Sequence, residues 1–392
     1  MRARPLLIVA LSAALLAGCG KDSDSLDRPV IGLRGGQEEA AQGLGFPSFA
    51  TKNTTRIGGA DAIADAAGVA RAVYPAATAD TRPDAVTLVD QRDWRIALAA
   101  SVLMARPLRA PILFTDGRRL PPASEAALKA LGPRGSRALE DAQVIRVGDV
   151  AEPEDFKARS LDGGDPFTVA DSIDRLIAGV RGAPSDRVVI VSSDSSKFAM
   201  PAAGWAAKSG DPVLFVKHDV VPPATIRALR RHDQPKIYVL GPAETVSAKV
   251  LKTLRKLGTV KRVEGADPVR NAIAFARYAD GPFAWGVIDP GHGLVFANTA
   301  QPLVAAAAAP LSATGKYGPL LLVDEARELP RPLTGYLLDI QPGYRRDPVR
   351  GVYNHGWVIG DDRAVSIAAQ TRLDALLEIT PVDQASAEST TP

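Results

Sequence analysis

Few side chains in this sequence are placed to do chemistry together. The histidines are far apart along the chain, whereas metal sites commonly use closely spaced pairs; they are His218, His232, His292 and His355. The serine-rich run Ser192–Lys197 could supply a nucleophile or hold a phosphate. It lacks both the Gly-x-Ser-x-Gly elbow and a glycine-rich Lys-Ser/Thr loop, so a polar turn fits better. Gly58-Gly59 and Gly163-Gly164 lack the full dinucleotide-binding pattern and fit turns. We therefore predict no catalytic residue, no metal site and no cofactor, and expect that the chain is not an enzyme.

The single cysteine indicates a covalent modification instead. Leu16-Ala17-Gly18-Cys19 closes an apolar run that follows Arg2 and Arg4 and is too short to span a bilayer. This segment closely resembles a bacterial lipobox. The resemblance implies that Cys19 is diacylated, becomes the mature N-terminus and holds the protein on the outer face of the cell membrane, because two acyl chains anchor stably. The alternative is an ordinary signal peptide beside a chance cysteine. With one cysteine, no intramolecular disulfide can form.

The composition indicates an aliphatic α/β protein. Hydrophobic residues make up 46% of the chain and aromatic residues only 5%, which is typical of layers packed through Ala, Val and Leu. The net charge of +3 is nearly balanced and argues against a wide nucleic-acid footprint. We predict a signal peptide over residues 1–18. Because the next stretch and the end of the chain are polar, we predict a flexible tether over 19–50 and a disordered tail over 381–392.

Three stretches of about 100 residues carry the same order of signals, which predicts an internal triplication. Each stretch opens with an arginine, continues through one or two glycines and ends in an aspartate. The three openings are Arg56-Ile57-Gly58-Gly59-Ala60-Asp61, Arg159-Ser160-Leu161-Asp162-Gly163-Gly164-Asp165 and Arg262-Val263-Glu264-Gly265-Ala266-Asp267. We place repeat 1 at 51–158, repeat 2 at 159–261 and repeat 3 at 262–380.

Each repeat contains three apolar runs that predict strands separated by helices. The first strands are expected at Val86–Asp90, Val188–Ser192 and Trp285–Asp289. The second strands are led by proline, as Pro111-Ile112-Leu113-Phe114, Pro212-Val213-Leu214-Phe215 and Pro319-Leu320-Leu321-Leu322. The third strands end in glycine, at Val144–Gly148, Ile237–Gly241 and Gly356–Gly360. Final helices are expected near Val246–Leu257 and Val365–Leu377, with a short counterpart at Pro153–Ala158. This succession predicts three Rossmann-like three-layer α/β/α repeats with parallel sheets, arranged as a triangular pseudo-trimer.

In its order and threefold recurrence, the pattern resembles the cell wall binding repeat 2 family. The resemblance covers roughly Thr55 to Thr380 and rests on the opening motif, the proline-led strands and a strand-Gly-x-x-x-x-Val-Ser phrase at Leu240–Ser247 and Ile359–Ser366. It implies a monomer with internal threefold pseudo-symmetry that attaches noncovalently to an anionic cell wall polymer. The resemblance also implies that the proline-led motif takes part in binding the polymer.

Aliphatic side chains cannot pair with phosphate or carboxylate groups. We therefore expect the proline-led residues to form buried strand core, and nearby cations to contact the polymer. The candidate cations are Arg56, Arg118, Arg119, Lys217, Arg262 and Arg327.

Two other functions remain as alternatives. Asp289-Pro290-Gly291-His292-Gly293 resembles the zinc-binding opening of cell wall amidases, but that family has a glutamate soon after the histidine and none lies between His292 and Glu325. We interpret the segment as a turn at the end of a strand, which leaves a cell wall hydrolase as the weakest alternative. A solute-binding lipoprotein of a transporter would need a deep cleft between two lobes. A threefold arrangement favours the repeat interpretation over both.

Overall fold

The structure is a computed structural model that describes residues 48–313 and 318–382. The predicted signal peptide, the lipidation site at Cys19 and all but the last three residues of the predicted tether lie outside the described residues. The last three tether residues form the short strand β1 (Ser48–Ala50). Among the described residues, no helix combines the length and apolar character needed to cross a bilayer.

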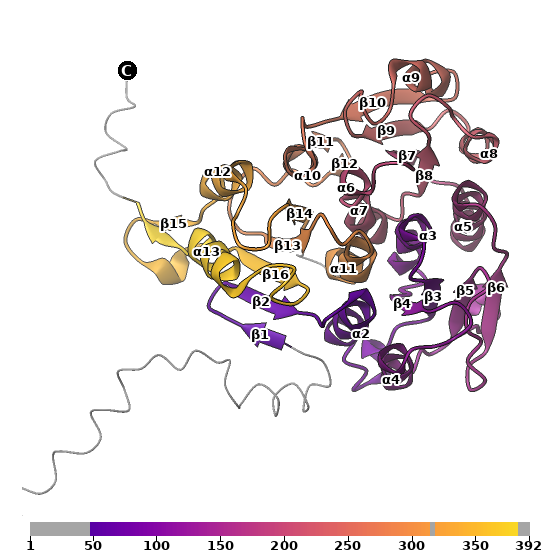
Figure 1. Cartoon of the computed structure of the whole chain (residues 1–392), viewed down its shortest axis with the longest axis horizontal. Helices are drawn as coiled ribbons and strands as arrows, with labels where there is room; N and C mark the ends of the chain where they lie inside the picture. The colour runs from indigo at the N-terminus through magenta and orange to yellow at the C-terminus, as the bar shows by residue number, and fades with distance from the viewer. Residues whose placement is uncertain (1–47, 314–317, 383–392) are drawn as a thin grey trace, which may run out of the picture.

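The chain folds into three α/β units (Figure 1). Each unit is built on a sheet in which the four strands common to all three units run parallel. The sheet of unit 1 has the order β4-β3-β5-β6. Its elements are β3 (Val86–Asp90), α3 (Trp94–Ala100), the 3-10 helix η2 (Ser101–Met104), β4 (Ile112–Thr115), α4 (Pro122–Leu131), η3 (Arg137–Leu139), β5 (Val144–Val147) and β6 (Ala158–Leu161). The short final helix expected at Pro153–Ala158 is absent, because Ala158 already begins β6.

Unit 2 repeats this order as β8-β7-β9-β10. Its elements are β7 (Arg187–Ser192), α6 (Ser196–Ala199), α7 (Ala202–Ser209), β8 (Val213–Val216), α8 (Pro223–Arg231), β9 (Lys236–Leu240), α9 (Ala248–Leu254) and β10 (Thr259–Val263). In units 1 and 2 the strands expected from sequence are confirmed, with end points shifted by at most one or two residues.

Unit 3 contains the main correction. Its first strand is β13 (Gly293–Asn298), not the predicted Trp285–Asp289, which has no regular structure. Gly286 has a φ of +61°, and Pro290 lacks an amide donor, so neither residue suits a central strand. The other elements are α11 (Leu303–Ala313), β14 (Leu320–Val323), α12 (Arg331–Asp339), β16 (His355–Ile359) and α13 (Ile367–Leu377). Short pairings add β11 (Ala279–Asp280) with β12 (Phe283–Ala284), and β15 (Gly343–Tyr344) with β17 (Thr380–Pro381).

The sheets are offset from the sequence repeats. Each opening motif forms a strand that joins the sheet of the preceding unit: β6 pairs with β5, and β10 pairs with β9. The first opening motif forms β2 (Thr54–Ile57), which pairs in parallel with β16 at the far end of the chain, placing Arg56 opposite Val358. The antiparallel strand β1 then completes the order β1-β2-β16-β13-β14. The three units therefore close into a ring.

A helix follows each opening strand and crosses to the next unit. These helices are α2 (Ala62–Val73), α5 (Pro166–Arg181) and α10 (Pro268–Arg277). Their first turns are capped by the aspartates of the opening motif, because Asp61, Asp165 and Asp267 each accept a hydrogen bond from a backbone N–H of the first turn. The repeated aspartate is thus a helix cap that fixes where strand ends and helix begins.

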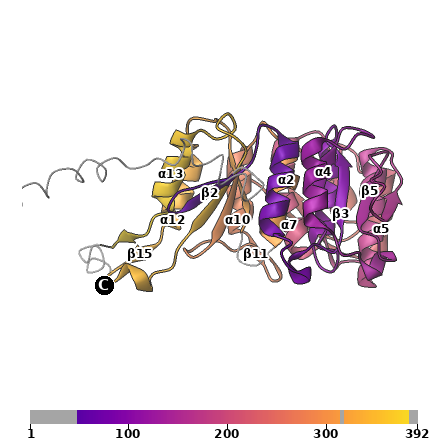
Figure 2. The same ribbon diagram turned by 90° about the horizontal axis from the view of Figure 1, so that it is seen from below.

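Three helices between the first and second strands of their units, α3, α7 and α11, lie where the three units meet (Figure 1; α7 is also labelled in the view from below in Figure 2). Helices α7 and α11 approach so closely that a Cβ on Gly204 would lie 2.7 Å from the Ser312 Oγ. An aromatic cluster seals the junction of units 2 and 3. Trp205 packs against Phe283 and Trp285, and the rings of Phe283 and Tyr238 stack with centroids 3.5 Å apart.

Candidate functional site: the carboxyl-edge loops

The proline-led strands lie at the outer edge of each sheet, yet their side chains are buried. Strands β4, β8 and β14 are the last strands of their sheets, and every residue of the three motifs is buried. The opening helix of the same repeat covers each of them: α2 packs on β4, α5 on β8 and α10 on β14. These residues therefore form strand core, as expected from their aliphatic side chains; they are Pro111, Ile112, Leu113, Phe114, Pro212, Val213, Leu214, Phe215, Pro319, Leu320, Leu321 and Leu322.

Four of the six candidate cations lie in the loop directly after a proline-led strand. Arg118 and Arg119 follow β4, Lys217 follows β8 and Arg327 follows β14, and all four are exposed. The loop then enters the next helix through a hydroxyl bond to the strand. Ser124 Oγ donates to the Phe114 carbonyl at 2.6 Å, and Thr225 Oγ1 donates to the Phe215 carbonyl at 2.7 Å. We call these three segments the carboxyl-edge loops: residues 116–121, 217–222 and 324–330.

In unit 1 the loop cations are paired with carboxylates. Arg118 Nε lies 2.8 and 2.9 Å from the two carboxylate oxygens of Asp149, and this hydrogen bond lowers the pKa of Asp149 below its ordinary value. Arg119 pairs with Asp116. Arg118, Arg119 and Asp149 are largely exposed and Asp116 is partly exposed, so these pairs contribute little stability and can exchange for an external anion.

In unit 2 the carboxyl-edge loop borders a surface hollow of about 420 Å³. Lys217 and Arg227 supply positive charge, while Phe167, Val220 and the two prolines Pro222-Pro223 supply apolar surface. The Lys217 ammonium lies 6.0 Å from the centroid of the Phe167 ring. The hollow thus combines groups that pair with an anion and groups that pack against a ring.

The other two candidate cations have structural roles. Arg56 is 9% exposed and donates to the backbone carbonyls of Gly360, Asp361 and Val365 at 2.7, 2.8 and 2.5 Å, and to the Gln370 side chain at 2.8 Å. Arg262 occupies the equivalent place in β10. It donates to the carbonyls of Gly241 and Val246 at 2.7 and 2.5 Å.

Unit 1 fills the same place from the neighbouring strand. Ser160 of β6 stands opposite Arg146 of β5, and Arg146 donates to the carbonyls of Val150 and Ala151 and to Ser160 Oγ. Each sheet therefore has a guanidinium that satisfies backbone carbonyls in the segment after its third strand. Arg56 is buried and Arg262 is half-buried, and both guanidinium groups are bound to backbone carbonyls.

A buried charge cluster between α5 and α8 was missed by the sequence analysis. Asp171 and Asp174 are each 1% exposed, and Arg231 pairs with both, with N–O distances of 2.5 and 2.7 Å. His232 Nε2 lies 3.0 Å from the Asp174 carboxylate, while its Nδ1 lies 2.6 Å from the Ser185 carbonyl. The spacing of Asp171 and Asp174 on one helix was the available signal, but their partners lie about 60 residues later.

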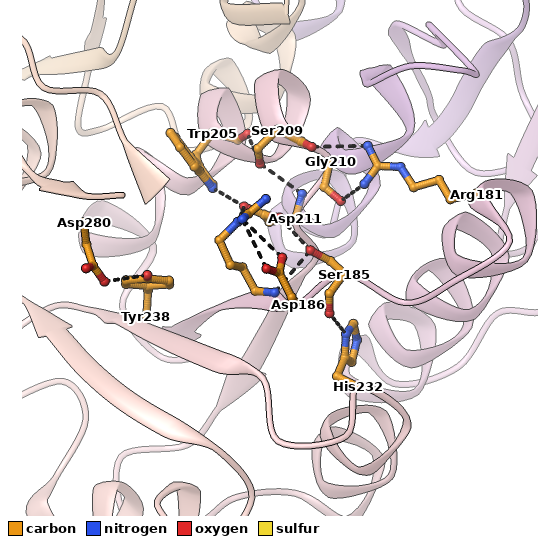
Figure 3. A network of polar contacts seen from close by, with 11 residues as sticks. Arg181, Ser185, Asp186, Trp205, Ser209, Gly210, Asp211, His232, Tyr238 and Asp280 are labelled. Atoms are coloured by element: carbon orange, nitrogen blue, oxygen red, sulfur yellow. Dashed lines mark hydrogen bonds and ion pairs between the residues drawn. The ribbon is translucent and has the colours of Figure 1, made fainter. Parts of the chain in front are cut away.

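The cluster continues beneath the proline-led strand of unit 2 (Figure 3). Asp211, directly before Pro212, is fully buried and accepts hydrogen bonds from Ser185 Oγ, Trp205 Nε1 and Arg187 Nε at 2.7, 2.9 and 3.2 Å. Figure 3 shows the Ser185 and Trp205 side chains directed toward its carboxylate. This network fixes the start of β8, and so the position from which the carboxyl-edge loop leaves.

The segments considered for hydrolytic chemistry have local partners. Residues 289–292 lie directly before β13, which begins at Gly293, rather than at the end of a strand as expected, and His292 Nε2 lies 3.0 Å from Asp289. Within residues 48–313 and 318–382, no group of three or more His, Cys, Asp or Glu side chains could hold a metal ion. Ser193 Oγ donates to Asp194, whose amide donates to Ser192 Oγ, so this run is a turn closed by its own side chains.

Comparisons with known proteins identify one relative by sequence and two solved structures with a similar fold. No family model matches the chain. The amidase enhancer of Bacillus subtilis (strain 168) is 24% identical over 186 residues, which make up 47% of this chain and 24% of that protein. Among solved structures, Cwp6 from Clostridium difficile is similar with a TM-score of 0.65 and 18% identity, covering 82% of this chain and 48% of that one. Cwp8 from Clostridium difficile has a TM-score of 0.62 and 18% identity, covering 83% and 52%.

These comparisons support the α/β fold with repeated Rossmann-like layers. The chain spans about half the length of the two solved chains and about a quarter of the curated relative. At these identities the likeness shows a common architecture.

Proposed function

We propose that this chain is a non-enzymatic cell-envelope protein that binds an anionic cell wall polymer through its carboxyl-edge loops. The observation that carries the proposal is the same in each unit: a buried proline-led strand ends in an exposed loop that bears a cation, at Arg118 and Arg119, at Lys217 and at Arg327. The fold shared with Cwp6 and Cwp8 and the distant match to an amidase enhancer support a cell-wall-associated role. Diacylation of Cys19 would hold the protein at the outer face of the cell membrane.

Repetition makes weak contacts effective. A single exposed lysine or arginine contributes little binding free energy in salt, because its attraction is screened over about 8 to 10 Å. Three such loops on one rigid ring can engage successive groups of one polymer, and each later contact forms at a high effective concentration. In this arrangement the proline-led motif acts indirectly, because its buried strand sets the position of the loop.

Charge reversal in the loops tests the proposal. The full chain carrying R118E, K217E and R327E should bind purified wall fractions at least tenfold more weakly than the unchanged chain, and the binding of the unchanged chain should weaken with salt. The matched control is K129E, K236E and K256E, which makes the same change in net charge at exposed positions near the opposite ends of the strands and helices. It should bind like the unchanged chain.

Two outcomes would overturn the proposal. Equal losses of binding in both triple variants would mean that net charge alone drives binding. Failure of the unchanged chain to bind any wall fraction at low salt would contradict polymer binding itself. The same incubations report on chemistry: release of soluble wall fragments by the unchanged chain would contradict a non-enzymatic role.

A further inference from the structure

Among the described residues, unit 3 holds most of the large apolar side chains that are exposed to solvent. Its two loops at the amino ends of the strands, residues 278–292 and 340–354, are longer than their counterparts in unit 2, residues 182–186 and 232–235. These loops and the segment after β17 hold five of the seven large apolar side chains exposed in the described residues. They are Ile288 (67% exposed), Val349 (81%), Val352 (50%), Tyr353 (52%) and Val382 (45%). We call this set the amino-edge patch.

The patch is held in place by buried polar contacts. Asn354, 2% exposed, accepts hydrogen bonds from the backbone N–H groups of Gly291 and His292 at 2.8 and 3.1 Å and donates to the Ile340 carbonyl at 2.8 Å. Tyr353 Oη donates to the Pro348 carbonyl at 2.6 Å. One buried amide therefore ties both long loops together, so the apolar groups are presented on an ordered surface.

Three arginines lie in the same loop as Val349, Val352 and Tyr353. Arg345, Arg346 and Arg350 lie in the same loop and are exposed, and within the described part of the chain none of the three makes a side-chain hydrogen bond or ion pair. The neighbouring acids are engaged locally. Asp347 caps the turn by accepting from the Val349 amide at 3.0 Å, and Asp289 pairs with His292.

We infer that the amino-edge patch docks on an anionic membrane surface. Apolar side chains beside arginines without acidic partners suit the boundary of a bilayer, where the apolar groups enter the acyl region and each cation gains about 1 kcal/mol from anionic lipid. A protein partner would need matching carboxylates to use the same arginines. The inference rests on the proposed membrane anchoring, which brings the patch within reach of lipid.

The tether does not prevent this orientation. Chain direction places Ser48 beside Ile57, at the carboxyl end of β2, so the tether enters at the edge opposite the patch. Cys19 lies 29 residues before Ser48, and a chain of that length spans at most about 100 Å. Docking would therefore turn the carboxyl-edge loops away from the membrane and toward the wall.

A fluorescent reporter tests docking directly. Because the chain has one cysteine, the full chain carrying C19S and V349C can be labelled at one site with a polarity-sensitive dye. Phosphatidylglycerol vesicles should shift its emission to the blue, and phosphatidylcholine vesicles should do so far less. A label at E244C in the same C19S background, exposed at the carboxyl edge of unit 2, should not shift.

Two variants separate this inference from the polymer proposal. Adding R345A, R346A and R350A to the labelled chain should weaken the vesicle response about tenfold or more. Adding R118E, K217E and R327E should leave that response unchanged while reducing wall binding. An absent shift at Val349→Cys, or a response that the arginine changes do not alter, would overturn membrane docking. Loss of wall binding in the arginine variant alone would assign the patch to the polymer instead.

Discussion

Arg56, at the start of the described chain, donates a hydrogen bond of 2.7 Å to the carbonyl of Gly360, 304 residues later. Three further bonds from the same guanidinium reach Asp361, Val365 and Gln370. They secure the parallel pairing of β2 with β16 and so close the ring of three units. The first ten described residues therefore hold the last unit in place.

Replacing Arg56 with lysine should loosen this closure. A lysine keeps the charge but cannot reach four acceptors arranged around a planar fork, so buried carbonyls lose their partner. We expect R56K to lower the free energy of unfolding by about 2 to 4 kcal/mol and to speed amide exchange in β1 and β2. Denaturant unfolding and hydrogen exchange would measure both effects.

The matched change is R262K, which removes an equivalent guanidinium that makes two backbone bonds within unit 2, between segments already joined directly through the chain. Its cost should be smaller. An R262K variant that is destabilised more than R56K would show that ring closure is not the weak point.

Asp65 in α2 should make stability depend on pH. It is 1% exposed, and burial raises its pKa to about 7 even though the Gly59 amide donates to it at 2.8 Å. The folded state thus holds a proton that the unfolded chain releases near pH 4, so the stability from this group falls as pH rises from about 4 to 7. Asp65→Asn should remove that loss and raise the free energy of unfolding at pH 8, by no more than about 4 kcal/mol.

Unit 3 supplies the control for Asp65. Asn271 occupies the equivalent position, and its side-chain oxygen accepts from the Gly265 amide at 3.2 Å. Asn271→Asp should lower stability at pH 8 and change it little at pH 4, which unfolding curves at the two pH values would show. Equal effects at both would contradict an ionisation cost.

His232 should also make stability depend on pH, through a charged ring paired with a carboxylate. Burial alone lowers its pKa, but hydrogen bonding and charge attraction to Asp174, together with the bond to the Ser185 carbonyl, raise the pKa above its ordinary value. The charged ring stabilises the fold fully below the unfolded pKa of about 6.5, and this contribution is lost as pH rises through the folded value.

His232→Gln should therefore cost about 1.5 to 3 kcal/mol near pH 6 and less near pH 9. Unfolding midpoints of both proteins across this range would test it. A cost that does not change with pH would show that His232 is neutral in the folded protein.

Much of the fold could be predicted because its signals are local. The proline-led runs and the glycine-ended strands are recognisable from a few neighbouring residues, and they lie at β4, β8, β14, β5, β9 and β16 as expected. The first strand of unit 3 was assigned wrongly, because two adjacent apolar runs compete there and the first contains Gly286 in a left-handed conformation.

Pairing between distant strands could not be predicted in the same way. Nothing near Arg56 in the sequence shows that its partners lie at Gly360 and beyond. The sequence therefore could not show that Arg56 is buried whereas Arg118 is exposed. The same limit hid Arg231 and His232, whose carboxylate partners come from an earlier helix. Hydrophobic periodicity identifies individual helices and strands. It does not show that the strand of each opening motif joins the sheet of the preceding unit, because that depends on packing.

The meeting of α3, α7 and α11 at the centre fixes the copy number of the repeat. In an open solenoid, further repeats add to a free end, and terminal caps vary independently of length. Here the place for a fourth copy is already taken by β2, and Gly204 lies against Ser312 without room for even a methyl group between the central helices. Such a protein diversifies by lengthening loops within a copy, as unit 3 has done, rather than by gaining or losing copies.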